Sequence, residues 1–172
     1  ILNAKNMATL RQRWSVDFAA SLGNVRVRVN IFNTDHGLSL AIRLLPNVIP
    51  TIDQLNLHPS IHGISDLKSG LVLICGTTGC GKTTTIASIL DDINHKRSAH
   101  IITLEDPIEY RIPSRKSFVE QREVGEHVPS FERGLIDIMR ADPDIIMVGE
   151  LRDPQTIALT LNAAESGHLV IA

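Results

Sequence analysis

The chain has 172 residues, of which 43% are hydrophobic and 21% are charged, a composition typical of one globular domain or two small ones. Its 17 basic and 19 acidic residues nearly cancel, so no positive surface for nucleic acid is indicated and no nucleic-acid partner is expected. No apolar run approaches the ~18 residues that span a bilayer, so direct membrane insertion is not expected either.

The cysteines and the chain ends indicate the cellular setting. Cys75 and Cys80 suit neither a disulfide framework nor a zinc site, which indicates a reducing compartment and, by default, the cytosol. Ile1 is no initiator residue, and the sequence stops inside an apolar run, 169–172, that is typical of a buried strand. We therefore interpret the sequence as part of a longer protein.

The first third of the sequence predicts a small antiparallel sheet. Apolar residues alternate with polar ones from Val25 to Ile31, which is the period of a half-buried strand. A turn-rich link separates this strand from a returning strand at 38–45, and residues 15–20 are a candidate third strand. Several prolines then interrupt regular structure, with one short helix expected near 52–57.

After Gly70 the pattern changes to strands that alternate with helices, which predicts a parallel sheet covered on both faces. In such a sheet, ligands bind at the carboxyl ends of the strands. Polar residues that close these strands are therefore expected to gather at one site. The expected strands are 71–75, 100–104, 145–148 and 169–172, and the expected helices lie near 82–95, 130–140 and 153–166.

A complete phosphate-binding loop, GxxxxGK[ST], lies between the first of these strands and the first helix. Its glycines let backbone N–H groups turn onto phosphate oxygens, while Lys82 reaches the β- and γ-phosphates and Thr83 supplies a hydroxyl to Mg²⁺. The helix that follows completes an anion site. The sequence therefore predicts ATP and Mg²⁺ as ligands. The predicted nucleotide-binding residues are Gly76, Thr77, Thr78, Gly79, Cys80, Gly81, Lys82, Thr83 and Thr84.

Acidic residues and a histidine flank the other predicted strands. Glu105 and Glu109 follow the second strand, Glu150 follows the third, and His168 opens the fourth. Hydrolysis needs a carboxylate to orient water, ligands for a metal and a group that senses the γ-phosphate, so we expect these residues around the loop. The alternatives are a solvated or capping acid and a histidine that only makes structural hydrogen bonds.

The third strand lacks the metal-binding Asp that most phosphate-loop ATPases carry, since Gly149 stands at that position. The Mg²⁺ shell is therefore expected to use Thr83, water and a carboxylate of the second strand, Glu105 or Glu109. Glu150 and Glu109 are expected to share water activation and metal binding, and the sequence does not divide the two roles between them.

These motifs, in this order, resemble the type II/type IV secretion ATPase superfamily, and most closely the retraction ATPases of type IV pili. Besides the loop, the segment 104–109 resembles the family's aspartate box, 142–153 its Walker B segment with Gly in place of Asp, and 163–168 the first half of its histidine box. Upstream, residues 25–30 and 41–43 look like the end of the family's PAS-like N-terminal domain.

The resemblance implies an α/β chain with part of a PAS-like antiparallel domain at 1–57, a linker at 58–69 and a C-terminally truncated RecA-like core at 70–172. It also implies catalytic roles for His168, which would sense the γ-phosphate, and for Arg28 and Arg43, which match arginines that reach the phosphates. For Arg28, the alternative is a solvated arginine on a strand.

The implied function is that of a homohexameric motor that hydrolyses Mg·ATP for pilus retraction, or twitching motility. Its implied partner is an inner-membrane platform protein of a pilus or secretion machine, at the cytoplasmic face of that membrane. Three alternatives stay open: an ATPase of pilus assembly or type II secretion, a scaffold that binds nucleotide without hydrolysing it, and a DNA-handling RecA-like ATPase, against which the lack of a basic stripe speaks.

Overall fold

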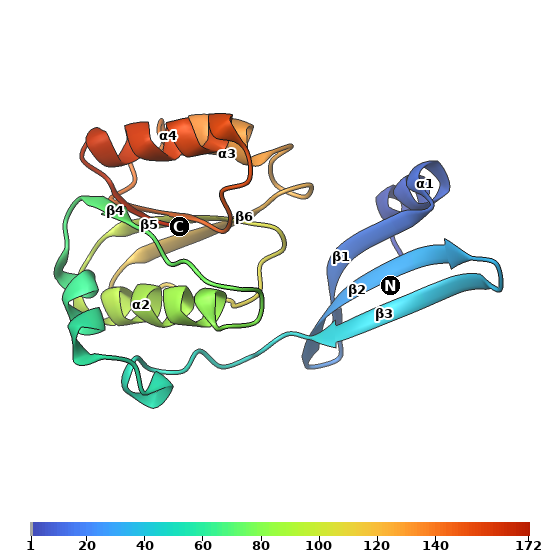
Figure 1. Ribbon diagram of the computed structural model, residues 1–172, viewed down its shortest axis with the longest axis horizontal. Helices are drawn as coiled ribbons and strands as arrows, with labels where there is room; N and C mark the ends of the chain where they lie inside the picture. Colours follow the sequence, from blue (N-terminus) through green and yellow to red (C-terminus); the bar gives the residue numbers. More distant parts are fainter. Residues whose placement is uncertain (1) are drawn as a thin grey trace. The chain divides into compact units, whose positions relative to one another are not determined.

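A computed structural model describes residues 2–172 and divides the chain into two compact units, one that ends at Asn47 and one that begins at Val48 (Figure 1). The boundary therefore lies earlier than the predicted end of the first domain at residue 57. Ile52 explains the difference, because its side chain is 3% exposed and packs in the core of the second unit with Ile86 and Ile89.

The first unit is a three-stranded antiparallel sheet with one helix. Its strands β1 (Ser15–Leu22), β2 (Val25–Thr34) and β3 (Gly37–Leu44) pair in the order β1-β2-β3, which confirms the predicted antiparallel sheet. Val27 and Val29 are buried against Leu10 of helix α1 (Ala4–Arg13). The sequence analysis missed α1, which begins after Asn3 with its side chain accepting a hydrogen bond from the N–H of Asn6.

The second unit contains the predicted parallel sheet, with one strand more than expected. Its order is β4-β8-β7-β5-β6, and all its pairs are parallel. The added strand, β6, pairs with β5 along its full length and forms an edge of the sheet. The strands are β4 (Gly70–Val72), β5 (His100–Glu105), β6 (Phe118–Glu123), β7 (Ile145–Val148) and β8 (Leu169–Ile171).

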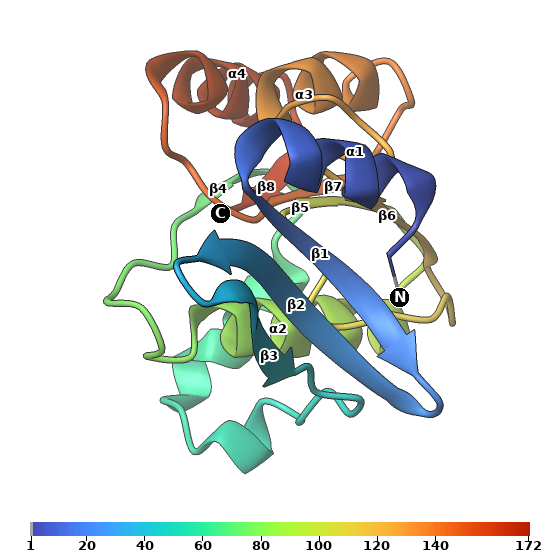
Figure 2. The same cartoon turned by 90° about the vertical axis from the view of Figure 1, so that its right-hand side faces the viewer.

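Helices cover both faces of this sheet, as Figures 1 and 2 show: α2 (Lys82–Lys96) covers one face, and α3 (Phe131–Ile138) and α4 (Pro154–Glu165) cover the other. Successive residues of a strand point to opposite faces. Accordingly, Ile145 packs in the core beside α2, whereas Ile146 packs in the core beside α3 and α4. No helix within residues 2–172 is both long enough and apolar enough to cross a bilayer.

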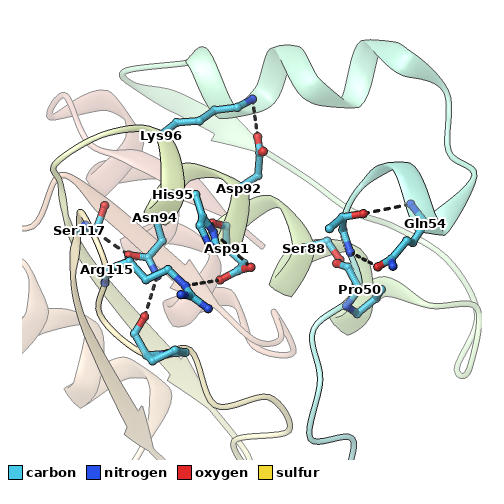
Figure 3. Close-up of polar contacts among 12 residues, drawn as sticks. Pro50, Gln54, Ser88, Asp91, Asp92, Asn94, His95, Lys96, Arg115 and Ser117 are labelled. Carbon is cyan, nitrogen blue, oxygen red and sulfur yellow. Dashed lines mark hydrogen bonds and ion pairs between the residues drawn. The ribbon is translucent and has the colours of Figure 1, made fainter.

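Buried polar contacts fix the position of α2 (Figure 3). The Ser88 hydroxyl donates to the carbonyl of Pro50 at 2.7 Å, which ties the helix to the segment that precedes the sheet. That segment contains the short turns η1 (Asp53–Leu55) and η2 (Pro59–Asp66). Asn94 is fully buried and bonds to the main chain of Pro113 and Arg115 at 2.7 and 3.0 Å. The helix that follows the phosphate-binding loop is therefore held along its length.

Candidate nucleotide-binding site

The loop between β4 and α2 has a conformation that requires glycine. Gly79 and Gly81 have φ values of +81° and +99°, a region that other residues rarely adopt. At Gly76 the reason is space, because an added Cβ would lie 2.5 Å from Sγ of Cys80. The three glycines of the loop, two of them fixed by the motif, therefore each have a physical role in shaping it.

The N-terminus of α2 offers donors for an anion. The other α-helices among residues 2–172 have side-chain caps from Asn3, Ser130 and Asp153, but no side chain caps α2, which begins after Gly81. The first N–H groups of a helix have no partner within the helix, and the dipole makes this end favourable for negative charge. These groups fit a phosphate.

Lys82 brings the positive charge to the loop itself. Its ammonium donates to the carbonyl oxygens of Gly76 and Thr77, both at 3.0 Å. The predicted binding residues from Gly76 to Thr84 thus form one continuous loop and first helical turn. Cys80 is an exposed free thiol whose Sγ lies beside Gly76.

A tyrosine joins this loop to the acidic segment that follows β5. The hydroxyls of Thr84, in the first turn of α2, and Tyr110 lie 3.0 Å apart. Tyr110 is only 7% exposed, so its hydroxyl position is well defined by packing. Glu109 is its direct neighbour in sequence. The segment that carries Glu109 therefore lies against the first turn of α2.

Glu105 closes β5 and is buried, with 6% of its surface exposed. Its carboxylate accepts hydrogen bonds from the Thr103 hydroxyl at 2.6 Å, from the Gln121 amide at 3.0 Å and from the N–H of Glu109. Burial raises the pKa of Glu105, and these hydrogen bonds only partly counter that effect. With its lone pairs used in this way, Glu105 is a poorer candidate for Mg²⁺ than the sequence suggested.

Glu150 follows β7 at the same edge of the sheet. Its carboxylate pairs with the guanidinium of Arg152 at 2.8 Å. The preceding Gly149 donates its N–H to the carbonyl of Leu104 at 2.8 Å, and a Cβ there would lie only 3.1 Å from that same oxygen. The close approach of β5 explains why no aspartate occupies this position.

The parallel topology brings these groups to one edge. The loop leaves the carboxyl end of β4, Glu150 follows that of β7, and Glu105 ends β5. β8 lies between β4 and β7, so about 10 Å separates the loop strand from the Glu150 strand at a spacing of about 4.8 Å per strand. A triphosphate with its metal spans a distance of that order.

Magnesium fits this site only together with a nucleotide. Within residues 2–172, no group of His, Cys, Asp and Glu side chains is arranged to hold a metal by itself. Mg²⁺ is commonly bound through one or two protein groups plus substrate phosphates, which suits the Thr83 hydroxyl and a carboxylate such as that of Glu109.

The expectation that His168 lies beside the loop is wrong. His168 precedes β8, and its carbonyl accepts the N–H of Gly70, the first residue of β4. In a parallel sheet this is the amino edge, opposite the loop. The ring bonds locally instead, to the carbonyl of Ala163 at 2.9 Å and the Ser166 hydroxyl at 3.0 Å, near the end of α4.

Arg28 and Arg43 lie in the first unit, directly opposite each other on β2 and β3. Arg28 belongs to the polar side of its strand, whereas its neighbours Val27 and Val29 are buried. Its guanidinium forms a two-pronged contact with Asp17 of β1. The two arginines are therefore register partners in the sheet, and their predicted contact with phosphates stays a prediction.

Sequence reasoning missed the residues that support the acidic segment, namely Tyr110, Gln121 and Glu123. Gln121 bonds to Glu105 and to the main chain of the segment, and the Glu123 carboxylate accepts the N–H of Ile108 at 3.0 Å. No local pattern marked residues 121 and 123, because 120–123 are four consecutive polar residues without the alternation of a half-buried strand.

A glycine-rich loop between a strand and an uncapped helix, at the carboxyl edge of a parallel sheet, defines a phosphate-loop nucleotide-binding α/β protein. Acidic residues lie at the same edge of the sheet. The chain belongs to the family described as Type II/IV secretion system protein, whose model matches residues 6–172.

Relatives agree with this assignment over nearly the whole chain. It is 45% identical over 172 residues to the uncharacterized protein YggR of Escherichia coli K12, covering 99% of this chain and 53% of that protein. It is 43% identical over 171 residues to the type IV pilus retraction ATPase PilT of Pseudomonas aeruginosa, covering 99% and 50%.

Among solved structures, the pilus retraction motor PilT with bound ADP superposes with a TM-score of 0.96 at 45% identity. The match covers 99% of this chain and 50% of that structure. The α/β fold, with a parallel five-stranded sheet and a separate antiparallel sheet before it, is therefore the fold of a PilT-type protein. The chain spans about half the length of the relatives it matches.

Proposed function

We propose that this chain is the nucleotide-binding part of an ATP-hydrolysing motor subunit that powers type IV pilus retraction. One observation carries the proposal: the phosphate-binding loop, Glu150 and the Glu109 segment share the carboxyl edge of a single sheet. The identity to PilT, and the ADP in the crystal structure of that motor, support ATP as the nucleotide and retraction as the task.

In the proposed mechanism, backbone N–H groups from Gly76 to Thr84 and the Lys82 ammonium hold the phosphates. Thr83 and a carboxylate of Glu109 or Glu150 would hold Mg²⁺, which when bound neutralises charge that develops on the transferred phosphoryl group. The other carboxylate orients and polarises the attacking water. Glu150 is the better candidate for orienting the water, because it follows β7, the central strand of the sheet.

Arg28 and Arg43 extend the proposal to the assembled motor. In a homohexamer, guanidinium groups from the first unit would add positive charge at the phosphates, beyond the positive charge that one nucleotide site supplies by itself. The contact between Arg28 and Asp17 would then exchange with a contact to phosphate. The machine-level proposal is a hexamer at the cytoplasmic face of the inner membrane, acting on a platform protein.

The matching family is described for both type II and type IV systems, so an ATPase of secretion or pilus assembly is the second candidate function. Loss of twitching with normal piliation in a deletion strain would support retraction, whereas loss of pili or of secretion would support the second candidate.

The biochemical test is phosphate release by the purified protein and by Lys82→Ala. Loss of the ammonium removes charge stabilisation at the β- and γ-phosphates, so turnover should fall by about 100-fold or more. A matched control is Lys68→Ala, on an exposed lysine just before β4. Equal turnover in Lys82→Ala and wild type would refute hydrolysis at this loop, and nucleotide binding without turnover would support the scaffold alternative.

A further inference from the structure

Gln121 on the edge strand β6 makes an unusual set of contacts for a side chain that the sequence analysis did not single out. Its amide nitrogen donates both to the buried carboxylate of Glu105, at 3.0 Å, and to the carbonyl of Tyr110, at 2.9 Å. Its amide oxygen accepts the N–H of Ile112 at 2.8 Å. One side chain therefore joins the end of β5 to two points of the acidic segment.

The segment 108–112 is held at both of its ends by β6. At one end, the Glu123 carboxylate accepts the N–H of Ile108 at 3.0 Å, and at the other, the Gln121 oxygen accepts the N–H of Ile112. Between these points, the N–H of Glu109 donates to Glu105. The backbone that carries the Glu109 carboxylate is thus fixed by three side-chain acceptors.

The same contacts reach the phosphate-binding loop. Tyr110, whose carbonyl is held by Gln121, places its hydroxyl 3.0 Å from that of Thr84. Thr84 belongs to the first turn of α2, directly after the predicted Mg²⁺ ligand Thr83. A continuous hydrogen-bonded path therefore runs from Gln121 through Tyr110 to the helix start that would bind phosphate.

We propose that Gln121 is a positioning residue which, with Glu105, fixes the place of the Glu109 carboxylate relative to the phosphate-binding loop. Glu105 in this arrangement is an internal acceptor and not a ligand of Mg²⁺. This inference rests on the proposed function, since its consequence for rate assumes that Glu109 acts on ATP or its metal. The geometry of the acidic segment, however, can be measured without turnover.

Physical chemistry predicts the consequence of removing the amide. An apolar side chain at position 121 would leave the Glu105 carboxylate, the Tyr110 carbonyl and the Ile112 N–H without this partner in a mostly buried region. Unsatisfied buried groups cost far more than the net value of the bond, so the segment would rearrange towards water. A displacement of about 1 Å at a catalytic group is enough to lower the rate strongly.

The test compares Gln121→Leu with Gln155→Leu, a matched change at an exposed glutamine in the first turn of α4. We expect Gln121→Leu to lower kcat by about tenfold or more while the dissociation constant for fluorescent ADP changes by less than about threefold, because the loop backbone stays intact. Amide hydrogen exchange should accelerate at 108–112 and stay unchanged in α2 and β7. Gln155→Leu should match wild type in all three measurements.

A rescue experiment separates positioning from a general loss of stability. Gln121→Glu places two carboxylates against each other, and adding Glu105→Gln restores one donor and one acceptor with the direction of the bond reversed. The double variant should recover part of the protection at 108–112 and part of the kcat lost in Gln121→Glu, with an unchanged Mg²⁺ requirement, because the bond to position 105 returns while the Tyr110 carbonyl still lacks its donor. If Gln121→Leu does not fold, Tyr110→Phe removes only the bond to Thr84 and should lower kcat with little change in ADP affinity.

Three results would overturn the inference. The first is unchanged exchange at 108–112 in Gln121→Leu, and the second is a loss of ADP affinity as large as the loss of kcat. The third is a sharply raised Mg²⁺ requirement in Glu105→Gln, which would restore Glu105 as a metal ligand. If the wild type binds ADP but releases no phosphate, the proposed function fails by itself, and hydrogen exchange still decides whether Gln121 holds the segment.

Discussion

The two edges of the parallel sheet carry similar residue types but use them differently. At the amino edge, the Asp144 carboxylate accepts the N–H of His100 at 2.7 Å, and the His168 ring bonds to the carbonyl of Ala163. At the carboxyl edge, the loop presents an uncapped helix start, and the Glu150 carboxylate pairs with the guanidinium of Arg152 at 2.8 Å. The polar residues named at the amino edge bond within the fold, whereas the loop and Glu150 at the carboxyl edge can contact a ligand.

The difference follows from chain direction. Helices of a parallel α/β unit begin near the carboxyl ends of the strands and end near their amino ends. Free helix N–H groups therefore collect at the carboxyl edge of the sheet, and free helix carbonyls collect at the amino edge. A histidine at the carbonyl-rich edge finds a structural partner, as His168 does at the end of α4. Chemistry on an anion is favoured only at the opposite edge.

The largest expected effect tests the carboxyl edge. Glu150→Gln keeps the size of the side chain but removes its ability to act as a base, so kcat should fall by about 100-fold or more while ADP affinity is retained. Phosphate release and fluorescent ADP binding measure the two quantities. The matched control is Glu120→Gln, on the edge strand β6, whose carboxylate pairs at 2.9 Å with His100 at the amino end of β5. A Glu150→Gln protein with the kcat of wild type would contradict the role of this edge.

Gly149→Ala tests the close approach between β7 and β5. The new Cβ would lie 3.1 Å from the Leu104 carbonyl oxygen and 3.4 Å from Cα of Glu105, both backbone atoms that cannot easily move. The free energy of unfolding should fall by about 1–3 kcal/mol, measured by denaturant titration. Gly63→Ala, where nothing lies within 4 Å of the added Cβ, is the control. Equal stability of both variants would mean that another reason excludes a side chain at position 149.

His168→Ala tests the amino edge. Loss of the ring removes its bonds to Ala163 and Ser166, which should lower the free energy of unfolding by about 0.5–1.5 kcal/mol. kcat for ATP should stay within about twofold of wild type, because the ring lies at the edge opposite the loop. A large loss of kcat at normal stability would show that the comparison between the two edges is too simple.

The smallest expected effect concerns Asp153, which caps α4 at the carboxyl edge. Hydrogen bonds from the hydroxyl and the N–H of Thr156 lower the pKa of Asp153 below its usual 3.8. A carboxyl with a lowered pKa in the folded state stabilises it above the unfolded pKa, and this contribution is lost as pH falls through the folded value. Asp153→Asn should therefore be less stable than wild type near pH 7, and thermal unfolding should show the gap closing below pH 3.8. A constant gap across pH would contradict this.

Strong local patterns made most of the fold predictable. The alternation from Val25 to Ile31 and the apolar run 145–148 correspond to β2 and β7, and the glycine motif located the loop. Helix α1 was missed because its ten residues bury only Asn6 and Leu10, too few for a helical pattern. Strand β6 was missed because it is a largely polar edge strand, whose position depends on pairing with β5.

The site was predictable as a set of residue types and less so as an arrangement. His168 was misplaced because a rule for the carboxyl ends of strands was applied to a residue that opens its strand and so lies at the amino end. The burial of Glu105 depends on Gln121, which lies sixteen positions further along the chain, so no local pattern contains it. Contacts of this kind arise from the packing of distant segments, which sequence periodicity does not encode.

A crystal structure with Mg²⁺ and a non-hydrolysable ATP analogue tests the central claim most directly. The account predicts phosphate oxygens within hydrogen-bonding distance of the N–H groups between Gly79 and Thr84. It also predicts the γ-phosphate close to the carboxylates of Glu150 and Glu109, with His168 of the same chain remote from it. A nucleotide bound elsewhere, or a γ-phosphate without either carboxylate nearby, would contradict the account.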